Sequence, residues 1–236
     1  IMLFSIDGLA YVCSAIALSF INYPRKYLSR GNESVLNSIR SGFLFFWSNV
    51  QLRAMTIYIA AAGCIVGGLM QLGFPILVKQ SLSGGGDSFG YLLACSGLGM
   101  TVGAICSVRY PQIGGLSLGV TFLFTDMLIG LLVVVLGGAT SMYVAFVAVF
   151  WVGFLGGYIR VVLISWVQRQ CSSETLGRVM SILILVTMGL TPLSAAVFGV
   201  LLKYIAITNM FFFAGLMLMI IALLGFTSSD LRSIRR

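Results

Sequence analysis

Residues 116–137 read LSLGVTFLFTDMLIGLLVVVLG, an apolar run that contains a single charged residue, Asp126. A helix needs about 20 predominantly apolar residues to cross the hydrocarbon core of a bilayer. The run therefore predicts a transmembrane helix, and an acidic side chain about ten residues into that helix needs its own explanation.

Six more runs in the chain have the same character. Breakers such as Tyr23-Pro24, the run 83–86, Pro111 and Gly137-Gly138 separate the runs, which cover residues 1–21, 54–78, 88–108, 142–166, 179–202 and 209–226. The first run carries Asp7 and has no basic segment before it, so it does not fit a secretory signal. We expect an all-α membrane protein with seven transmembrane helices.

The composition agrees with a surface that faces lipid. Hydrophobic residues make up 59% of the chain and charged residues 8%, with a mean hydropathy of +1.07. A soluble domain carries about 25% charged residues. The net charge of +8 does not indicate nucleic acid, because the basic residues lie in the short gaps between apolar runs. The expected surroundings are a lipid bilayer.

The chain has no histidine, and its five cysteines have no CxxC spacing. The absence of histidine excludes His-ligated zinc, bis-His haem and Ser-His or Cys-His dyads. The cysteines predict small packing residues, not a disulfide framework. We expect no catalytic residue, no metal and no cofactor, and hence no enzyme.

The basic residues predict the orientation of the spans. Eleven of the 14 Lys and Arg residues follow the first, third, fifth and seventh spans, and only Lys79 and Lys203 lie in the other set of loops. Cytoplasmic loops carry an excess of Lys and Arg. We therefore expect the N-terminus outside and the C-terminus, with its basic tail 227–236, in the cytoplasm.

The loop 22–53 is longer than the others. Val35, Ile39, Phe43 and Phe46-Trp47 recur at helical spacing, which favours an amphipathic helix on the cytoplasmic membrane surface. A plain linker with chance periodicity is the alternative.

Several segments carry a family resemblance over almost the whole chain. Residues 4–12 (FSIDGLAYV), 38–47 (SIRSGFLFFW), 90–103 and 168–181 (QRQCSSETLGRVMS) resemble consecutive parts of a major facilitator superfamily transporter, from its sixth helix to the loop between helices ten and eleven. The closer resemblance is to the drug and siderophore exporters that include macrolide-efflux and enterobactin-export proteins. One departure is the loop 109–114, which keeps Arg109 and Gly114 but lacks the acidic residue of the superfamily signature.

The resemblance implies an architecture and a function. Residues 1–21 would be the last helix of an N-terminal half, 22–53 the linker, and 54–226 a C-terminal six-helix bundle; the missing N-terminal helices of the same transporter would be partners. The implied function is secondary active export of a drug-like or siderophore-like small molecule by alternating access, coupled to protons. The implied location is the plasma membrane, in a bacterium the inner membrane.

Charged and polar residues within spans are the candidates for substrate binding or proton coupling: Asp126, Arg160, Gln71 and Asp7. A charged Asp at mid-membrane costs about 2.5–3.5 kcal/mol, so Asp126 must be protonated, paired or in a watery cavity; a structural bond to Thr121 or Thr125 is the alternative. Arg160 lies nearer a span end and could instead snorkel to the headgroups. The patterns Gly67-Gly68-x-x-Gln71 and Gly156-Gly157-x-x-Arg160 would place Gln71 and Arg160 on a cavity wall.

Glu174 and Arg178 are candidates for a cytoplasmic gate, together with Arg109. Glu174 and Arg178 are four residues apart and would meet on one helical face. An ordinary helix start, with Glu174 near the positive end of the helix dipole, explains the pair equally well.

Small residues and prolines predict helix packing and helix bending. Small residues four apart let membrane helices approach closely, as in the pairs Gly63 and Gly67, Gly99 and Gly103, and Gly153 and Gly157. Static packing would need the same pairs. Pro75 and Pro192 lie inside spans, where each removes a backbone hydrogen bond and is expected to kink its helix.

Two other classes of membrane protein remain as alternatives. A seven-helix receptor would share the orientation, but the expected outer loops are short and contain no cysteine. A non-transporting scaffold would not explain Asp126 and Arg160 at membrane depth.

Overall fold

A computed structural model describes residues 2–20, 47–80, 86–110, 117–228 and 232. The chain divides into two units, residues 1–37 and 38–236, which are described separately. Every regular element in the described residues is a helix. The prediction of an all-α membrane protein is confirmed at this level.

In the first unit, the described helix is α1 (Met2–Ser19). Its apolar part, Gly8–Ser19, is shorter than the spans of the second unit. That this helix is a seventh membrane span stays a prediction. The predicted surface helix falls mainly on residues 22–46, which lie outside the described residues.

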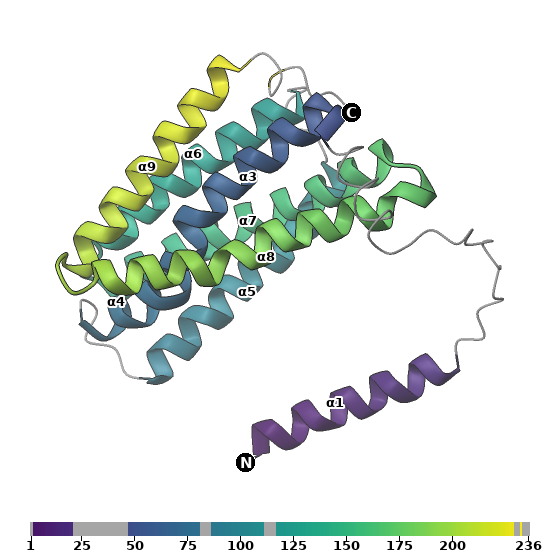
Figure 1. Cartoon of the computed structure of the whole chain (residues 1–236). Helices are drawn as coiled ribbons and strands as arrows, with labels where there is room; N and C mark the ends of the chain where they lie inside the picture. Colours follow the sequence, from purple (N-terminus) through teal and green to yellow (C-terminus); the bar gives the residue numbers. More distant parts are fainter. Residues whose placement is uncertain (1, 21–46, 81–85, 111–116, 229–231, 233–236) are drawn as a thin grey trace. The chain divides into compact units, whose positions relative to one another are not determined.

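The second unit contains the helices that position the candidate site (Figure 1). They are α3 (Val50–Gly68), the π-helical turn η1 (Leu69–Gly73), α4 (Phe74–Gln80), α5 (Gly86–Arg109), α6 (Leu118–Gly137), α7 (Met142–Gln170), α8 (Ser173–Leu201) and α9 (Ile207–Thr227). α3, η1 and α4 form one continuous span, so that the described residues contain six helices long and apolar enough to cross a membrane. These helices confirm the six predicted spans from residue 54 onward.

Polar residues just outside the apolar runs start two of these helices. The Asn49 side chain accepts the backbone N–H of Leu52 at 3.2 Å, and the Ser117 hydroxyl oxygen accepts that of Val120 at 3.3 Å. Each bond satisfies a backbone donor that the first turn of a helix leaves without a partner. This is why α3 begins four residues before the predicted start of its span.

The helices of the second unit pack in pairs. α5 packs along α7, α6 along α9 and α3 along α8, while α6 also contacts α7 and α3 also contacts α9 (Figure 1). Buried side chains form two apolar clusters, one around Leu69, Leu136 and Phe211 and the other around Leu52, Phe122 and Trp166.

The α5–α7 pair is held by the glycines that the sequence singled out. A Cβ atom on Gly99 or Gly103 would overlap the backbone carbonyl of Phe150 or Phe154. A Cβ atom on Gly153 or Gly157 would likewise overlap the backbone carbonyl of Ser96 or Met100. The Cys95 thiol extends this row and donates to the Phe146 carbonyl at 3.5 Å. At these four positions only a missing side chain lets the two backbones approach so closely.

The Gly63–Gly67 pair behaves differently. Gly67 packs closely on α8, since a Cβ atom there would lie 3.1 Å from Thr191 Oγ1. A Cβ atom on Gly63 would meet none of the described residues within 4 Å. This face of α3 instead opens onto a cavity that Gly63 lines. On α8, the Ser194 hydroxyl donates to the Cys64 carbonyl and adds a polar contact between these two helices.

A second close crossing, between α6 and α9, was not expected. A Cβ atom on Gly130 would lie 2.8 Å from the Gly215 carbonyl oxygen, and Gly215 faces Gly130 in the same way. Neither glycine has another glycine four residues away, so no four-residue repeat marks them in the sequence.

The two prolines lie in different helical surroundings. Pro75 follows the π-helical turn η1, which widens the helix where the proline ring would crowd the carbonyl four residues earlier. Pro192 lies inside α8, which remains helical on both sides of it. The helix bounds do not test the kinks themselves, which stay predictions.

Candidate functional site

A cavity of about 500 Å³ lies between α3, α6, α7, α8 and α9. Sites for small molecules in proteins measure about 300–1,000 Å³ and combine apolar walls with a few polar groups. The walls here are mainly aliphatic, with the charged groups Asp126 and Arg160 and the hydroxyl group of Thr187. The lining residues are Ile59, Ala62, Gly63, Val66, Phe122, Asp126, Ile129, Ile159, Arg160, Leu163, Ile164, Met180, Leu183, Ile184, Thr187, Met188 and Leu218.

Asp126 is the acidic residue of this cavity. It is the ninth residue of the 20-residue helix α6, near the middle of the span as predicted. Its carboxylate oxygen Oδ2 accepts a hydrogen bond of 2.7 Å from the hydroxyl group of Tyr58 on α3. The polar partner and the cavity together explain how a short acidic side chain can be placed at this depth.

The expected alternative, a bond from Asp126 to a threonine of its own helix, is not what the structure shows. The Thr125 hydroxyl donates to the Thr121 carbonyl at 2.7 Å, and the Thr121 hydroxyl donates to the Ser117 carbonyl at 3.1 Å. Both hydroxyl groups are occupied by backbone acceptors one turn earlier, so they are not the donors that hold Asp126.

Arg160 lines the same cavity from α7, and its side chain is exposed. The Thr187 hydroxyl, on α8, donates to the Leu183 carbonyl at 2.8 Å, which leaves its oxygen free to accept another hydrogen bond. The cavity therefore offers an acidic group, a basic group and a hydroxyl acceptor from three different helices.

The other two candidates for substrate binding are Gln71 and Asp7. Gln71 is exposed in η1 and is not among the residues that line this cavity. The repeated Gly-Gly spacing failed to place it there because the π-helical turn changes the angular register of the residues that follow Gly68. Asp7 is part of α1 in the first unit, and its side chain lies outside the described residues.

The gate candidates occupy helix ends. Glu174 and Arg178 belong to the first turns of α8, although the side chain of Glu174 lies outside the described residues. Arg109 is the last residue of α5 and is exposed. Beside it, the backbone carbonyl of Tyr110 accepts a hydrogen bond of 2.8 Å from the Tyr158 hydroxyl on α7.

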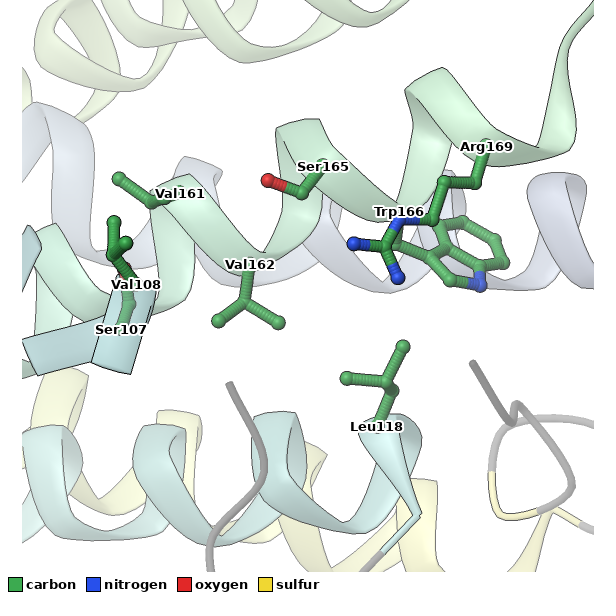
Figure 2. Close-up of a pocket in the computed structure, with 8 residues that line it drawn as sticks. All are labelled: Ser107, Val108, Leu118, Val161, Val162, Ser165, Trp166 and Arg169. Carbon is green, nitrogen blue, oxygen red and sulfur yellow. The ribbon is translucent and has the colours of Figure 1, made fainter. Parts of the chain in front are cut away.

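A smaller pocket of about 180 Å³ lies near this end of α5 and α7. Figure 2 shows Ser165, Trp166 and Arg169 along one side of it, with Leu118 facing them from the start of α6. The Trp166 indole N–H is buried and has no hydrogen-bond acceptor among the described residues. Four valine and leucine side chains complete most of its walls: Val108, Leu118, Val161 and Val162.

Tyr58 is the site residue that sequence reasoning missed. The only sign in the sequence was a tyrosine within an apolar span, which also fits an ordinary packing residue. Within the part of the chain that the structure describes, no group of three or more His, Cys, Asp or Glu residues could hold a metal ion.

Comparison with known families gives one match. The family model described as transmembrane secretion effector, a major facilitator type, matches residues 1–235. No curated protein matches the chain.

Proposed function

Because the chain belongs to the transmembrane secretion effector family of the major facilitator superfamily, and is thus an integral membrane transport protein, we propose that it exports a small molecule in exchange for protons. The observation that carries the proposal is Asp126, a carboxyl group at mid-span that opens into a cavity of about 500 Å³. A secondary transporter places its substrate and its coupling ion near the middle of the membrane.

The composition of the cavity fits a largely apolar substrate. Most of its walls are aliphatic side chains, and Arg160 and Thr187 add polar contacts. A drug-like or siderophore-like compound matches such a surface, with its polar groups directed to Asp126, Arg160 and Thr187. We propose that Asp126 carries the coupling proton and that Arg160 contacts the substrate.

We further propose that residues 50–227 act as one half of an alternating-access transporter. α5 and α8 are the least buried of the six spans, and both expose large apolar side chains such as Leu98, Ile105, Leu185 and Leu193. These faces are the ones that other helices of the same transporter would cover.

Replacement of the carboxyl group tests the proposal. In the full-length protein, Asp126→Asn should insert normally and abolish proton-driven efflux of erythromycin and ethidium from membrane vesicles. The matched control is Asp87→Asn, which removes an exposed carboxyl group from the first turn of α5. Wild-type efflux by Asp126→Asn, with an unchanged pH dependence, would remove Asp126 from the mechanism.

A further inference from the structure

Tyr58 places a hydroxyl group next to Asp126 without lining the cavity itself. Its side chain is 6% exposed and belongs to the buried cluster that also contains Leu52, Met55 and Phe122. A tyrosine that only filled this apolar space would need no hydroxyl group, since phenylalanine has the same ring. The hydroxyl group therefore has a role of its own.

The position of the Tyr58 ring is fixed by three helices. The ring belongs to α3 and lies among buried side chains of α6. On α9, Gly225 is a near neighbour of the ring, since a Cβ atom there would lie in van der Waals contact, 3.5 Å from the ring carbon Cε2. Closely packed aromatic rings stay in one orientation, so the hydroxyl group meets Asp126 from a constant direction.

In this geometry the two oxygens of the Asp126 carboxyl group have different surroundings. Oδ2 accepts the 2.7 Å hydrogen bond from Tyr58, which lies behind it in the cluster. Asp126 itself lines the cavity. With one oxygen held from behind, the other oxygen is the one left for a proton or a substrate group from the cavity.

The bond also joins two helices whose main packing partners differ. α3 packs mainly on α8 and α9, and α6 packs mainly on α9 and α7. A hydrogen bond to an ionised carboxylate is roughly twice as strong as a neutral one. The bond between α3 and α6 is thus stronger when Asp126 is ionised and weaker when it carries a proton.

The charged and titratable residues that face Asp126 across this region are few. Tyr58 comes from α3 and Arg160 from α7, whereas the cavity residues of α8 are uncharged and α9 contains no charged residue at all. We therefore expect the strength of the Tyr58–Asp126 hydrogen bond, which joins α3 to α6, to depend on whether Asp126 is ionised.

We propose that Tyr58 is a positioning residue for Asp126: its hydroxyl group holds Oδ2, turns the other carboxylate oxygen toward the cavity and links α3 to α6. This inference rests on the proposed role of Asp126 in coupling. It predicts that Tyr58 acts only through Asp126.

A double-mutant cycle in the purified full-length protein tests the contact. Tyr58→Phe should lower the midpoint of thermal unfolding when Asp126 is present and should not lower it in the Asp126→Ala background, because interacting residues give non-additive effects. The matched control is Tyr158→Phe, which removes another buried hydroxyl group with a 2.8 Å bond to the Tyr110 carbonyl. Its effect should be the same in both backgrounds. Equal effects of Tyr58→Phe in both backgrounds would overturn the proposal.

A second readout separates positioning from a purely structural bond. With Ile184→Cys as a reporter in the cavity wall and the native cysteines replaced by serine, the rate of labelling by a membrane-impermeant maleimide is measured against pH. Tyr58→Phe should change the pH profile of labelling, and Tyr158→Phe should leave it unchanged. An unchanged profile for Tyr58→Phe, despite coupling in thermal unfolding, would show a structural bond only and would also overturn the proposal.

The two proposals can fail separately. If Asp126→Asn exports erythromycin and ethidium like the wild type, the proposed coupling role of Asp126 fails, whatever the cycle shows. Suppose instead that Asp126→Asn loses efflux, but that Tyr58→Phe has the same effect on thermal unfolding in both backgrounds and leaves the pH profile of labelling unchanged. The coupling role of Asp126 then stands, and the positioning role of Tyr58 fails.

Discussion

Asp126 on α6 and Arg160 on α7 line the same cavity; Asp126 is the ninth of the 20 residues of its helix and Arg160 the nineteenth of 29. Arg160 could have been explained by a long side chain that only reaches for the headgroups. Because Arg160 also lines the cavity, its guanidinium group can contact a bound substrate. The two explanations predict different results for two substitutions.

Arg160→Gln should reduce efflux by about tenfold or more in the full-length protein, because a hydrogen bond to a charged group contributes roughly 1.5–3 kcal/mol. Arg160→Lys keeps the charge but loses the planar fork of donors, so efflux should fall to an intermediate level. The measurement is the initial rate of erythromycin efflux at matched expression. Full activity of both variants would leave Arg160 as a snorkelling residue.

Gly103→Ala should destabilise the α5–α7 pair, since its Cβ atom would overlap the Phe154 carbonyl oxygen. Overpacking of this kind costs about 1–3 kcal/mol. Gly97→Ala, on the same helix, is the matched control, because a Cβ atom there would lie within 4 Å of no atom in the part of the chain that the structure describes. Thermal unfolding of the purified protein should therefore distinguish the two variants. Equal midpoints would mean that the two backbones are not held as closely as described.

Arg178→Glu should shift the facing state of the full-length protein if Arg178 belongs to a gate. The readout is maleimide labelling of Ile184→Cys, which lies in the cavity wall. Arg169→Glu, an exposed position in the last turn of α7, is the control for a charge reversal at a helix end. The exchange Glu174→Arg with Arg178→Glu should restore the labelling if the two charges act as a pair. Normal labelling of the single variant would favour an ordinary helix start.

Cys171, between α7 and α8, should react slowly with maleimides at neutral pH. Burial raises the pKa of its thiol above the ordinary value of 9.0, and the thiolate is the reactive form. Its labelling rate, followed on the peptide that contains it by mass spectrometry, should still increase as the pH passes 9.0. Cys171→Ser should remove the signal. A rate that levels off below that pH would contradict the effect of burial.

Close helix packing was predictable only where the sequence repeats it. Gly99 and Gly103 stand four residues apart, as do Gly153 and Gly157, so that each pair marks one helical face. Gly130 and Gly215 pack as closely, but neither has another glycine four residues away, and their contact depends on how α6 crosses α9. Gly63 carries the repeat yet faces the cavity, because spacing identifies a face and not the neighbour that the face meets.

The sequence by itself determined the class of protein, the six spans from α3 to α9 and the depth of Asp126. Each of these depends on local properties: the length of an apolar run, the residues that start a helix and the rise of 1.5 Å per residue. The tertiary structure alone decided that Asp126 is bound by Tyr58, that Arg160 shares its cavity and that Gln71 does not. Those relations join residues of different helices, and the apolar surfaces of membrane helices allow many pairings. Only the packed bundle selects one of them.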